Sequence, residues 1–216
     1  NPSIRDVADQ MCDALDGLDY VGVVNVSYMA IANLPPMKPF LRLADLIGSI
    51  KAQMAATPIK KIVLKTWGAR DVDITTPSVR KLLMALVLKG IIAVVAPDSA
   101  PTLISAPFLA EQLGLEVVIS DQTPTKAGPP YLNLITVEAE FEDGTSGRIS
   151  GSIFGTTPHI VELDEYSNRV AFSPDTRHLL TFRNLDRPGA VAGVLDILQE
   201  ANINIAALHV ARQDDG

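Results

Sequence analysis

Hydrophobic residues recur every three or four positions in five stretches of the chain, which is the spacing of an amphipathic helix. These stretches cover residues 3–17, 40–54, 76–90, 106–114 and 190–201. Ser3 and Thr76 are suited to cap the first and third helices, and Pro77 fits the first helical position. Gly90 is expected to end the third helix, since glycine is common just beyond a helix C-terminus.

Short apolar runs between these helices predict β-strands. The runs cover residues 20–29, 59–66, 91–96, 115–119, 178–183 and 203–211. A hairpin is predicted around Glu142–Thr145, because Asp143-Gly144 favours a tight turn and alternating residues precede it. Helices and strands that alternate in this way predict an α/β or α+β fold with a mixed sheet.

Two segments mark expected domain boundaries. The three prolines of residues 34–39 can continue neither a helix nor a strand, and residues 164–175 are polar and turn-rich. We therefore predict three regions, at 1–33, 34–173 and 174–216. The last region is a βαβ unit, whose strands are expected to be parallel with a right-handed crossover. Such a unit has too small a core to stand alone, so a partner chain or further sequence is expected to complete it.

Composition removes several classes of function. A hydrophobic content of 47% in 216 residues is ample for a folded core, and no apolar run reaches the roughly 18 residues of a membrane span. The net charge of -7 disfavours nucleic acid, and the single cysteine, Cys12, cannot build a thiolate metal site. We expect a cytoplasmic protein without membrane or nucleic-acid partners.

Signatures of catalysis are also missing from the sequence. None of the 14 glycines forms a G-x-G pair, which excludes the dinucleotide and phosphate loops built on that pattern. The three histidines are far apart without acids or cysteine at ligand spacing, and neither Ser105 nor Ser152 lies in a G-x-S-x-G elbow. We predict no metal and no catalytic residue in this chain.

Asn184, Asp186 and Asn204 form a candidate site at a strand-to-helix junction. Asp186 can accept hydrogen bonds from an ammonium group, and the two amides can donate to a carboxylate. The helix that follows Pro188-Gly189 adds free backbone N–H groups. These groups suit a zwitterionic amino acid. The alternative is that Asp186 caps the helix and Asn184 closes a turn, and the local chemistry by itself favours that alternative.

Two motifs in this part of the chain resemble those of the ACT domain, a regulatory module that binds small molecules. They are Leu-Asp-Arg-Pro-Gly at Leu185–Gly189 and Ala-Asn-Ile-Asn-Ile-Ala-Ala at Ala201–Ala207. The form is similar to the C-terminal module of the D-3-phosphoglycerate dehydrogenase family. The resemblance implies the first βαβ half of a ferredoxin-like fold, with L-serine bound between two modules by Asn184, Asp186 and Asn204. It also implies homodimers or homotetramers.

The resemblance extends towards the N-terminus. Pro39–Gly48 and Ile104–Glu111 are similar to the intervening domain of the long form of this family, called the allosteric substrate-binding domain. Residues 1–33 resemble the last helix and a returning strand of the cofactor domain. The chain is thus expected to be a C-terminal regulatory fragment of an NAD-dependent oxidoreductase of L-serine biosynthesis, binding no NAD itself. An anion site in the intervening domain would need cations, and Arg148 and Arg169 are the candidates; ordinary solvated surface charge is the favoured alternative for both.

Two other functions remain open from the sequence. A bacterial L-serine dehydratase carries a related intervening domain beside an ACT domain, although its iron-sulfur cluster needs cysteines that this chain does not supply. An ACT-bearing transcriptional or metabolic regulator is the third alternative. Its basic DNA-binding element is absent from these 216 residues.

Overall fold

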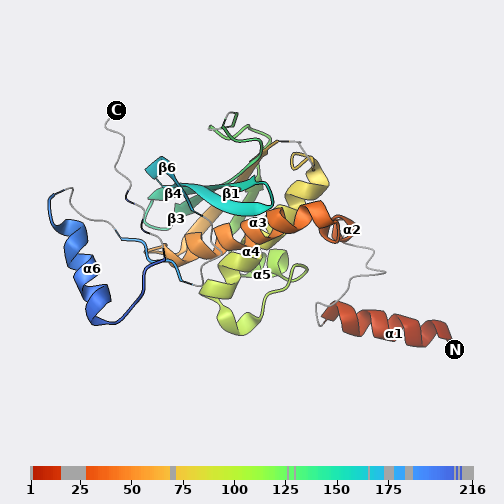
Figure 1. The fold of residues 1–216 in the computed structure, drawn as a ribbon. Helices are drawn as coiled ribbons and strands as arrows, with labels where there is room; N and C mark the ends of the chain where they lie inside the picture. The colour runs from red at the N-terminus through yellow and green to blue at the C-terminus, as the bar shows by residue number, and fades with distance from the viewer. Residues whose placement is uncertain are drawn as a thin grey trace.

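A computed structural model describes most of the chain as a mixed α/β protein (Figure 1). The described residues are 2–15, 28–68, 72–125, 127–128, 130–164, 166–172, 178–182, 187–206, 208 and 210. The α-helices are α1 (Pro2–Leu15), α2 (Met29–Ala32), α3 (Lys38–Gln53), α4 (Pro77–Val95), α5 (Ala106–Gln112) and α6 (Ala190–Glu200). Two short 3-10 helices are η1 (Pro35–Met37) and η2 (Pro97–Ser99). The strands are β1 (Ile59–Trp67), β2 (Glu116–Ile119), β3 (Leu134–Phe141), β4 (Ser146–Phe154), β5 (Thr157–Leu163) and β6 (Tyr166–Phe172).

The six strands form one sheet in the order β2-β1-β3-β4-β5-β6. Strands β1 and β2 are parallel and are joined through α4 and α5, whereas every other neighbouring pair is antiparallel. The expected hairpin joins β3 to β4, and Gly144 in its turn has φ +80°, a conformation that favours glycine. A mixed sheet was predicted and is confirmed.

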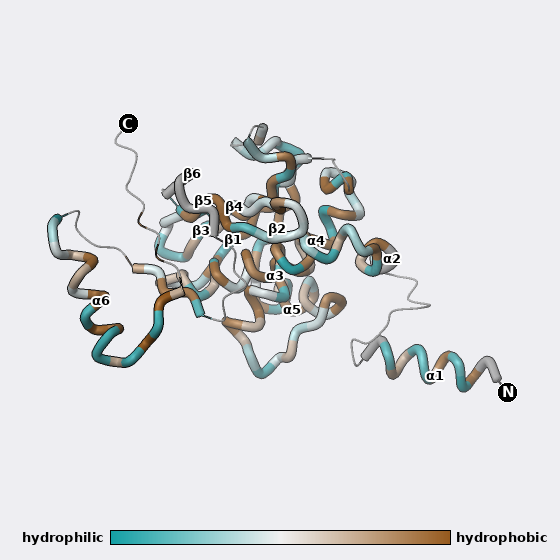
Figure 2. Tube along the Cα trace, viewed as in Figure 1, coloured by the Kyte–Doolittle hydropathy of each residue, from teal (hydrophilic) through white to brown (hydrophobic). Residues whose placement is uncertain are grey.

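The main core lies between the sheet and the pair of helices α3 and α4. Side chains alternate along each strand, so Ile62 and Leu64 of β1 are fully buried against the helices. Helix α4 is apolar on nearly every side because it lies between α3, α5 and the sheet. Figure 2 shows these apolar segments gathered in the middle of the molecule.

Helices α3 and α4 approach each other through two glycines. A Cβ on Gly90 would lie 2.8 Å from the backbone nitrogen of Ser49 and closer still to the carbonyl oxygen of Asp45. A Cβ on Gly48 would meet the backbone of Val87 in the same way. Each glycine thus lets the backbone of the opposite helix come into direct contact.

This contact corrects one prediction from the sequence. Gly90 does not end a helix, and residues 91–95 are not a strand, because α4 continues through both to Val95. The glycine is explained by tertiary packing rather than by helix termination. Ile91 and Ile92 in the short apolar run after it are buried, and periodicity cannot separate a buried helix from a buried strand over so few residues.

Two further differences concern the end of the sheet. Residues 166–172, which were expected to belong to a polar approach to the next domain, form β6 and pair with β5. Strand β5 itself was not predicted. Strand β5 pairs with the edge of β4, and β6 pairs in turn with β5, which is a tertiary reason that local composition does not carry.

The C-terminal region agrees with its predicted helix but not with its predicted strands. Helix α6 covers Ala190–Glu200 as expected, whereas residues 178–182 and 203–206 are outside any strand. A strand forms only when a neighbour accepts its backbone hydrogen bonds, and the described part of the chain supplies none there. The predicted strand at 20–29 lies almost wholly outside the described residues, and its last residue, Met29, begins α2.

Candidate functional site

The three residues expected to contact an amino acid are only partly described. Asn184 and Asp186 lie outside the described residues, and Asn204 is exposed after α6. Gly189 precedes α6 with φ +86°, so the helix begins at a residue that only glycine fits easily. The amino-acid site therefore remains a prediction, with its helix in the expected place.

Arg148 and Arg169, the two expected cations, lie on different strands. Arg148 is on β4, and its Nη2 lies 3.0 Å from Oε1 of Glu162 on β5. Arg169 is on β6, beyond β5, and its side chain is not described. Because Arg148 already has a carboxylate partner, nothing in this arrangement favours an anion there, and that site too stays a prediction.

Glu162 is the centre of a polar row that crosses three strands. Its side chain is 2% exposed, and its Oε2 accepts a hydrogen bond of 2.5 Å from the hydroxyl of Ser150. The hydroxyls of Ser150 and Thr136 are 2.8 Å apart. A buried carboxylate is tolerated only where such partners replace water. The row from Thr136 to Arg148 meets that requirement.

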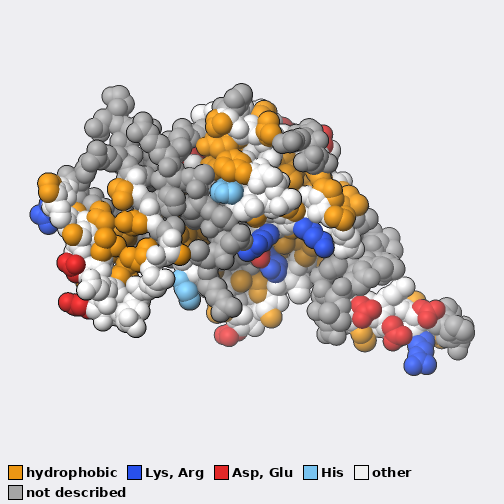
Figure 3. Space-filling model, viewed as in Figure 1, with side chains coloured by type: hydrophobic (Ala, Val, Ile, Leu, Met, Phe, Trp, Pro, Cys, Tyr) orange, Lys and Arg blue, Asp and Glu red, His pale blue; other side chains and the backbone are white. Residues whose placement is uncertain are grey.

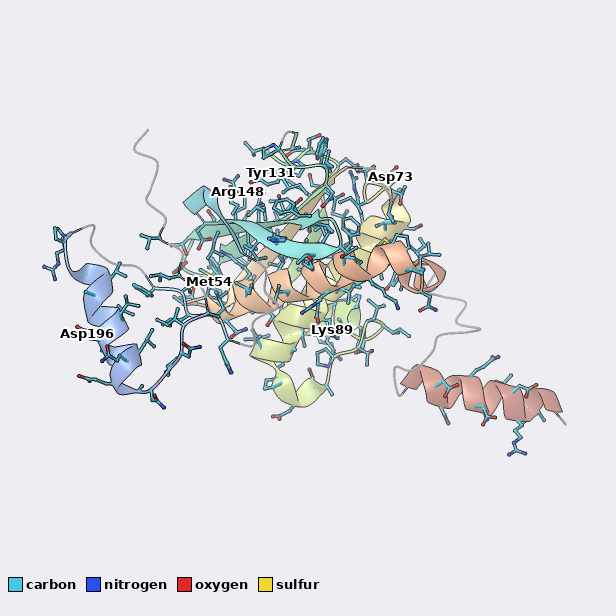
Figure 4. The ribbon with its side chains drawn as sticks, in the orientation of Figure 1. Met54, Asp73, Lys89, Tyr131, Arg148 and Asp196 are labelled. Carbon is cyan, nitrogen blue, oxygen red and sulfur yellow. The ribbon has the colours of Figure 1, made fainter. Side chains whose placement is uncertain are left out.

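Strand register explains why these side chains meet. Thr136 pairs with Ser150 across β3 and β4, and Ser150 pairs with Glu162 across β4 and β5. Directly opposed residues point to the same side of a sheet, so the three side chains share the face turned away from α3. Figure 4 shows Arg148 and Tyr131 above the strands on this side.

Asn133 reinforces the same face just before β3. Its Oδ1 accepts from the backbone N–H of Ile153 at 2.7 Å, and its carbonyl oxygen accepts from the Ser152 hydroxyl at 2.7 Å. Asn133, Ser150 and Ser152 are all buried. Hydroxyls and amides thus stabilise this face beside a small apolar cluster that contains Tyr131, Leu134 and Val161. The larger core lies on the helical face.

Tyr131 covers the end of this polar face. Burial raises the pKa of the Tyr131 phenol, and the negative charge of Glu162 adds to the rise. The Tyr131 ring stacks on that of Phe154 with centroids 6.3 Å apart, and Phe154 stacks on His159 at 4.6 Å. Nδ1 of His159 lies 3.0 Å from the carbonyl oxygen of Thr157, which fixes the orientation of the imidazole.

We expect the raised pKa of Tyr131 to make stability fall at alkaline pH. A phenol whose folded pKa is raised contributes its stabilisation below the unfolded pKa of about 10 and loses it as pH rises through the folded value. Urea unfolding between pH 8 and pH 11 should therefore show a steeper loss in the native chain than in Tyr131→Phe. An equal pH dependence in the two proteins would refute the role of Tyr131; Tyr28, whose pKa burial also raises, contributes equally to both.

A second buried charge lies at the end of α3. Nζ of Lys51 is 2.6 Å from Oδ1 of Asp164, and the same oxygen accepts the backbone N–H of Arg148 at 3.0 Å. Gly147 makes room for this pair, because a Cβ there would lie 3.1 Å from Cε of Lys51 and closer to Nζ. The ion pair ties α3 to the turn between β5 and β6.

Four residues of these buried contacts were not predicted from the sequence: Glu162, Ser150, Tyr131 and Lys51. A signal was present in β4, where Arg148, Ser150 and Ser152 alternate with apolar or small residues, a pattern typical of a polar sheet face. Among the described residues no group of three or more His, Cys, Asp or Glu side chains is placed to hold a metal ion. No helix in that part of the chain is long and apolar enough to cross a membrane.

This fold and its polar sheet face define a mixed α/β domain. The family model of the D-3-phosphoglycerate dehydrogenase intervening domain matches residues 36–164. The chain belongs to that family.

Several relatives share nearly the whole chain. It is 30% identical over 210 residues to the D-3-phosphoglycerate dehydrogenase of Methanocaldococcus jannaschii, covering 97% of this chain and 37% of that protein. It is 26% identical to the Rattus norvegicus enzyme of the same name and 25% identical to that of Bacillus subtilis. Those alignments cover 98% and 97% of this chain, and 39% and 38% of the two relatives. The chain thus spans somewhat more than a third of these relatives, and none of them supports the dehydratase alternative.

Proposed function

We propose that this chain is the regulatory part of an NAD-dependent D-3-phosphoglycerate dehydrogenase of L-serine biosynthesis. It senses L-serine at an interface between ACT modules and supports a homodimer or homotetramer. The observation that carries this proposal is the intervening-domain match at residues 36–164, followed at Leu185–Gly189 and Ala201–Ala207 by motifs that resemble an ACT domain. NAD and the catalytic groups are expected on other segments of the parent enzyme.

The exposed surface of the C-terminal region supports the interface. Large apolar side chains there are open to solvent, and Figure 3 shows them as orange patches around α6. They are Leu179, Leu180, Phe182, Ile197, Ile203, Ile205, Leu208 and Val210. Exposed apolar side chains gathered in this way are typical of a module that packs against another copy.

L-serine would be held by charge and amide complementarity. Asp186 accepts from its ammonium group, and Asn184 and Asn204 donate to its carboxylate or meet its hydroxyl. The effector can bias activity only by binding more tightly to one assembly than to the other. An interface site achieves this bias because it exists only where two modules meet.

Calorimetric titration with L-serine tests the proposal, using both this chain and one that carries a complete ACT module. We expect heat and a rise in the melting temperature with the complete module, and loss of both in Asp186→Asn. Asp196→Asn is the matched control, since Asp196 is an exposed carboxylate on α6 and should leave serine binding unchanged. Absence of heat and of any thermal shift with the complete module would defeat the serine assignment.

A further inference from the structure

We propose that β2 is a dimerisation edge, at which two copies of this chain pair their β2 strands antiparallel and join their sheets into one. Strand β2 lies at the end of the sheet, and in the described part of the chain β1 is its single neighbour. Its outer backbone groups therefore lack a strand to pair with. An edge strand of this kind is a template for another strand.

The backbone directions in β2 identify the groups that are free. The N–H of Ser120, directly after the strand, donates to the carbonyl oxygen of Leu64 on β1 at 2.9 Å. Alternate residues of a strand turn their N–H and C=O groups to opposite edges, so the N–H and C=O groups of Val118 also point towards β1. Val117 and Ile119 consequently direct theirs away from it. Val117 and Ile119 are themselves 38% and 36% exposed.

The sequence of β2 contains none of the features that usually protect an edge. Natural edges carry lysine, proline, a bulge or an inward-facing charge. Strand β2 reads Glu-Val-Val-Ile, and its register with β1 is continuous. The one charge, Glu116, is at its start and is paired with Lys61 at 2.9 Å. Three consecutive β-branched residues thus form an apolar edge.

Charge and symmetry select a second copy in antiparallel orientation. A two-fold axis at Val118 places Val117 of one copy opposite Ile119 of the other, so the outward N–H and C=O groups of both residues bond each other. The two Glu116 carboxylates then lie at opposite ends of the paired strands. Parallel pairing would instead bring them side by side, where like charges repel. A two-fold contact is also self-complementary, as an isologous dimer requires.

Helix α5 precedes β2 in the chain and carries further exposed apolar side chains. It leads into β2 through Gly114, and Phe108 and Leu113 are exposed on and directly after the helix. A four-residue strand pair alone buries much less than the roughly 1,600 Å² of a standard interface. The dimer is therefore expected to be weak and concentration-dependent in this chain.

Cysteine cross-linking in a Cys12→Ser background tests the register. In the proposed dimer the Val118 residues of the two copies lie opposite each other, with Cα atoms about 4.5 Å apart, which is within reach of a disulfide. The two Val117 residues are too far apart for one. We expect Val118→Cys to form a covalent dimer under mild oxidation at least about tenfold faster than the control Val117→Cys. Equal rates for the two variants would overturn the proposal.

A proline variant separates edge pairing from random collision. Val117→Pro removes an N–H that points away from β1, so the β1–β2 ladder is kept while the outer edge is blocked. We expect it to abolish cross-linking through Val118→Cys, and to convert the concentration-dependent dimer to monomer in sedimentation velocity. Unchanged cross-linking in the proline variant would contradict the two-fold edge. So would a chain without the proline that stays monomeric at every concentration, or one that assembles beyond a dimer without limit. Circular dichroism confirms that the proline variant is folded.

Discussion

Gly90→Ala is expected to destabilise the protein by about 3 kcal/mol or more, because it forces a methyl group into the backbone of α3. The new Cβ would lie 2.8 Å from the nitrogen of Ser49 and closer to the carbonyl oxygen of Asp45. A backbone oxygen in a packed helix cannot move aside as a flexible side chain does, so α3 and α4 must separate. Separation loses contacts along the main core. Thermal unfolding should show a melting temperature lower by roughly 10 °C.

The same substitution in α6 serves as the control. Gly193 is inside that helix, and a Cβ there would meet no heavy atom within 4 Å. Gly193→Ala should therefore leave stability unchanged or raise it by up to about 1 kcal/mol, through helix propensity. Gly48→Ala should behave like Gly90→Ala, since it meets the backbone of Val87. If Gly90→Ala has the same melting temperature as the native protein, the close approach of α3 and α4 is wrong.

Asp164→Asn is the second change with a large expected effect, a loss of about 3 kcal/mol. The side chain of Lys51 is 2% exposed, so removing the charge of Asp164 leaves a buried ammonium without its counter-ion. Asp164 has φ +51°, and asparagine tolerates that conformation, so the backbone is not a second cause of the loss. Urea unfolding of the variant should show a lower midpoint with an unchanged slope.

An exposed aspartate that also accepts two hydrogen bonds provides the comparison. Asp143, in the turn between β3 and β4, accepts the backbone N–H of Thr145 at 2.9 Å and its hydroxyl at 2.6 Å. These bonds hold the pKa of the Asp143 carboxyl below its ordinary value. Asp143→Asn should nevertheless move the urea midpoint much less, because no buried charge depends on it. Equal shifts in the two variants would show that the Lys51 pair contributes no more than a surface turn.

The two buried ion pairs hold neighbouring parts of the same hairpin. Arg148 bonds Glu162 through its side chain and Asp164 through its backbone N–H, and Asp164 also bonds Lys51. The end of β5 is thereby fixed to both β4 and α3. In the proposed function this matters because residues 174–216, with the predicted serine site, follow β5 and β6 in the chain.

Most helices could be predicted because their amphipathic spacing and termini are local properties. Helices α1, α3, α5 and α6 lie where the periodicity placed them, and Thr76-Pro77 correctly marked the start of α4. The end of α4 was mistaken because Gly90 has two uses that a sequence does not separate. Glycine can end a helix through a positive φ, or it can admit a neighbouring backbone, and only the position of α3 decides between them.

The candidate sites show the same division. Asn184, Asp186 and Asn204 were selected by local chemistry and by resemblance. Glu162 and Ser150 were not selected, although both are buried in one hydrogen-bonded row. They are twelve residues apart in the chain and meet only through the register of β4 and β5. A pairing register with its bulge is not encoded in the spacing of either strand alone.

The sequence by itself determined helices α1, α3, α5 and α6, the start of α4, the β3–β4 hairpin, the mixed α/β class and the family to which the chain is similar. These follow from periodicity, turn residues and motifs that act over a few positions. Tertiary structure decided the length of α4, the existence of β5 and β6, and the partners of Lys51, Arg148 and Glu162. It also left β2 at an open edge. The physical reason is that burial and strand pairing depend on which distant segments come together, and only the folded chain brings them into contact.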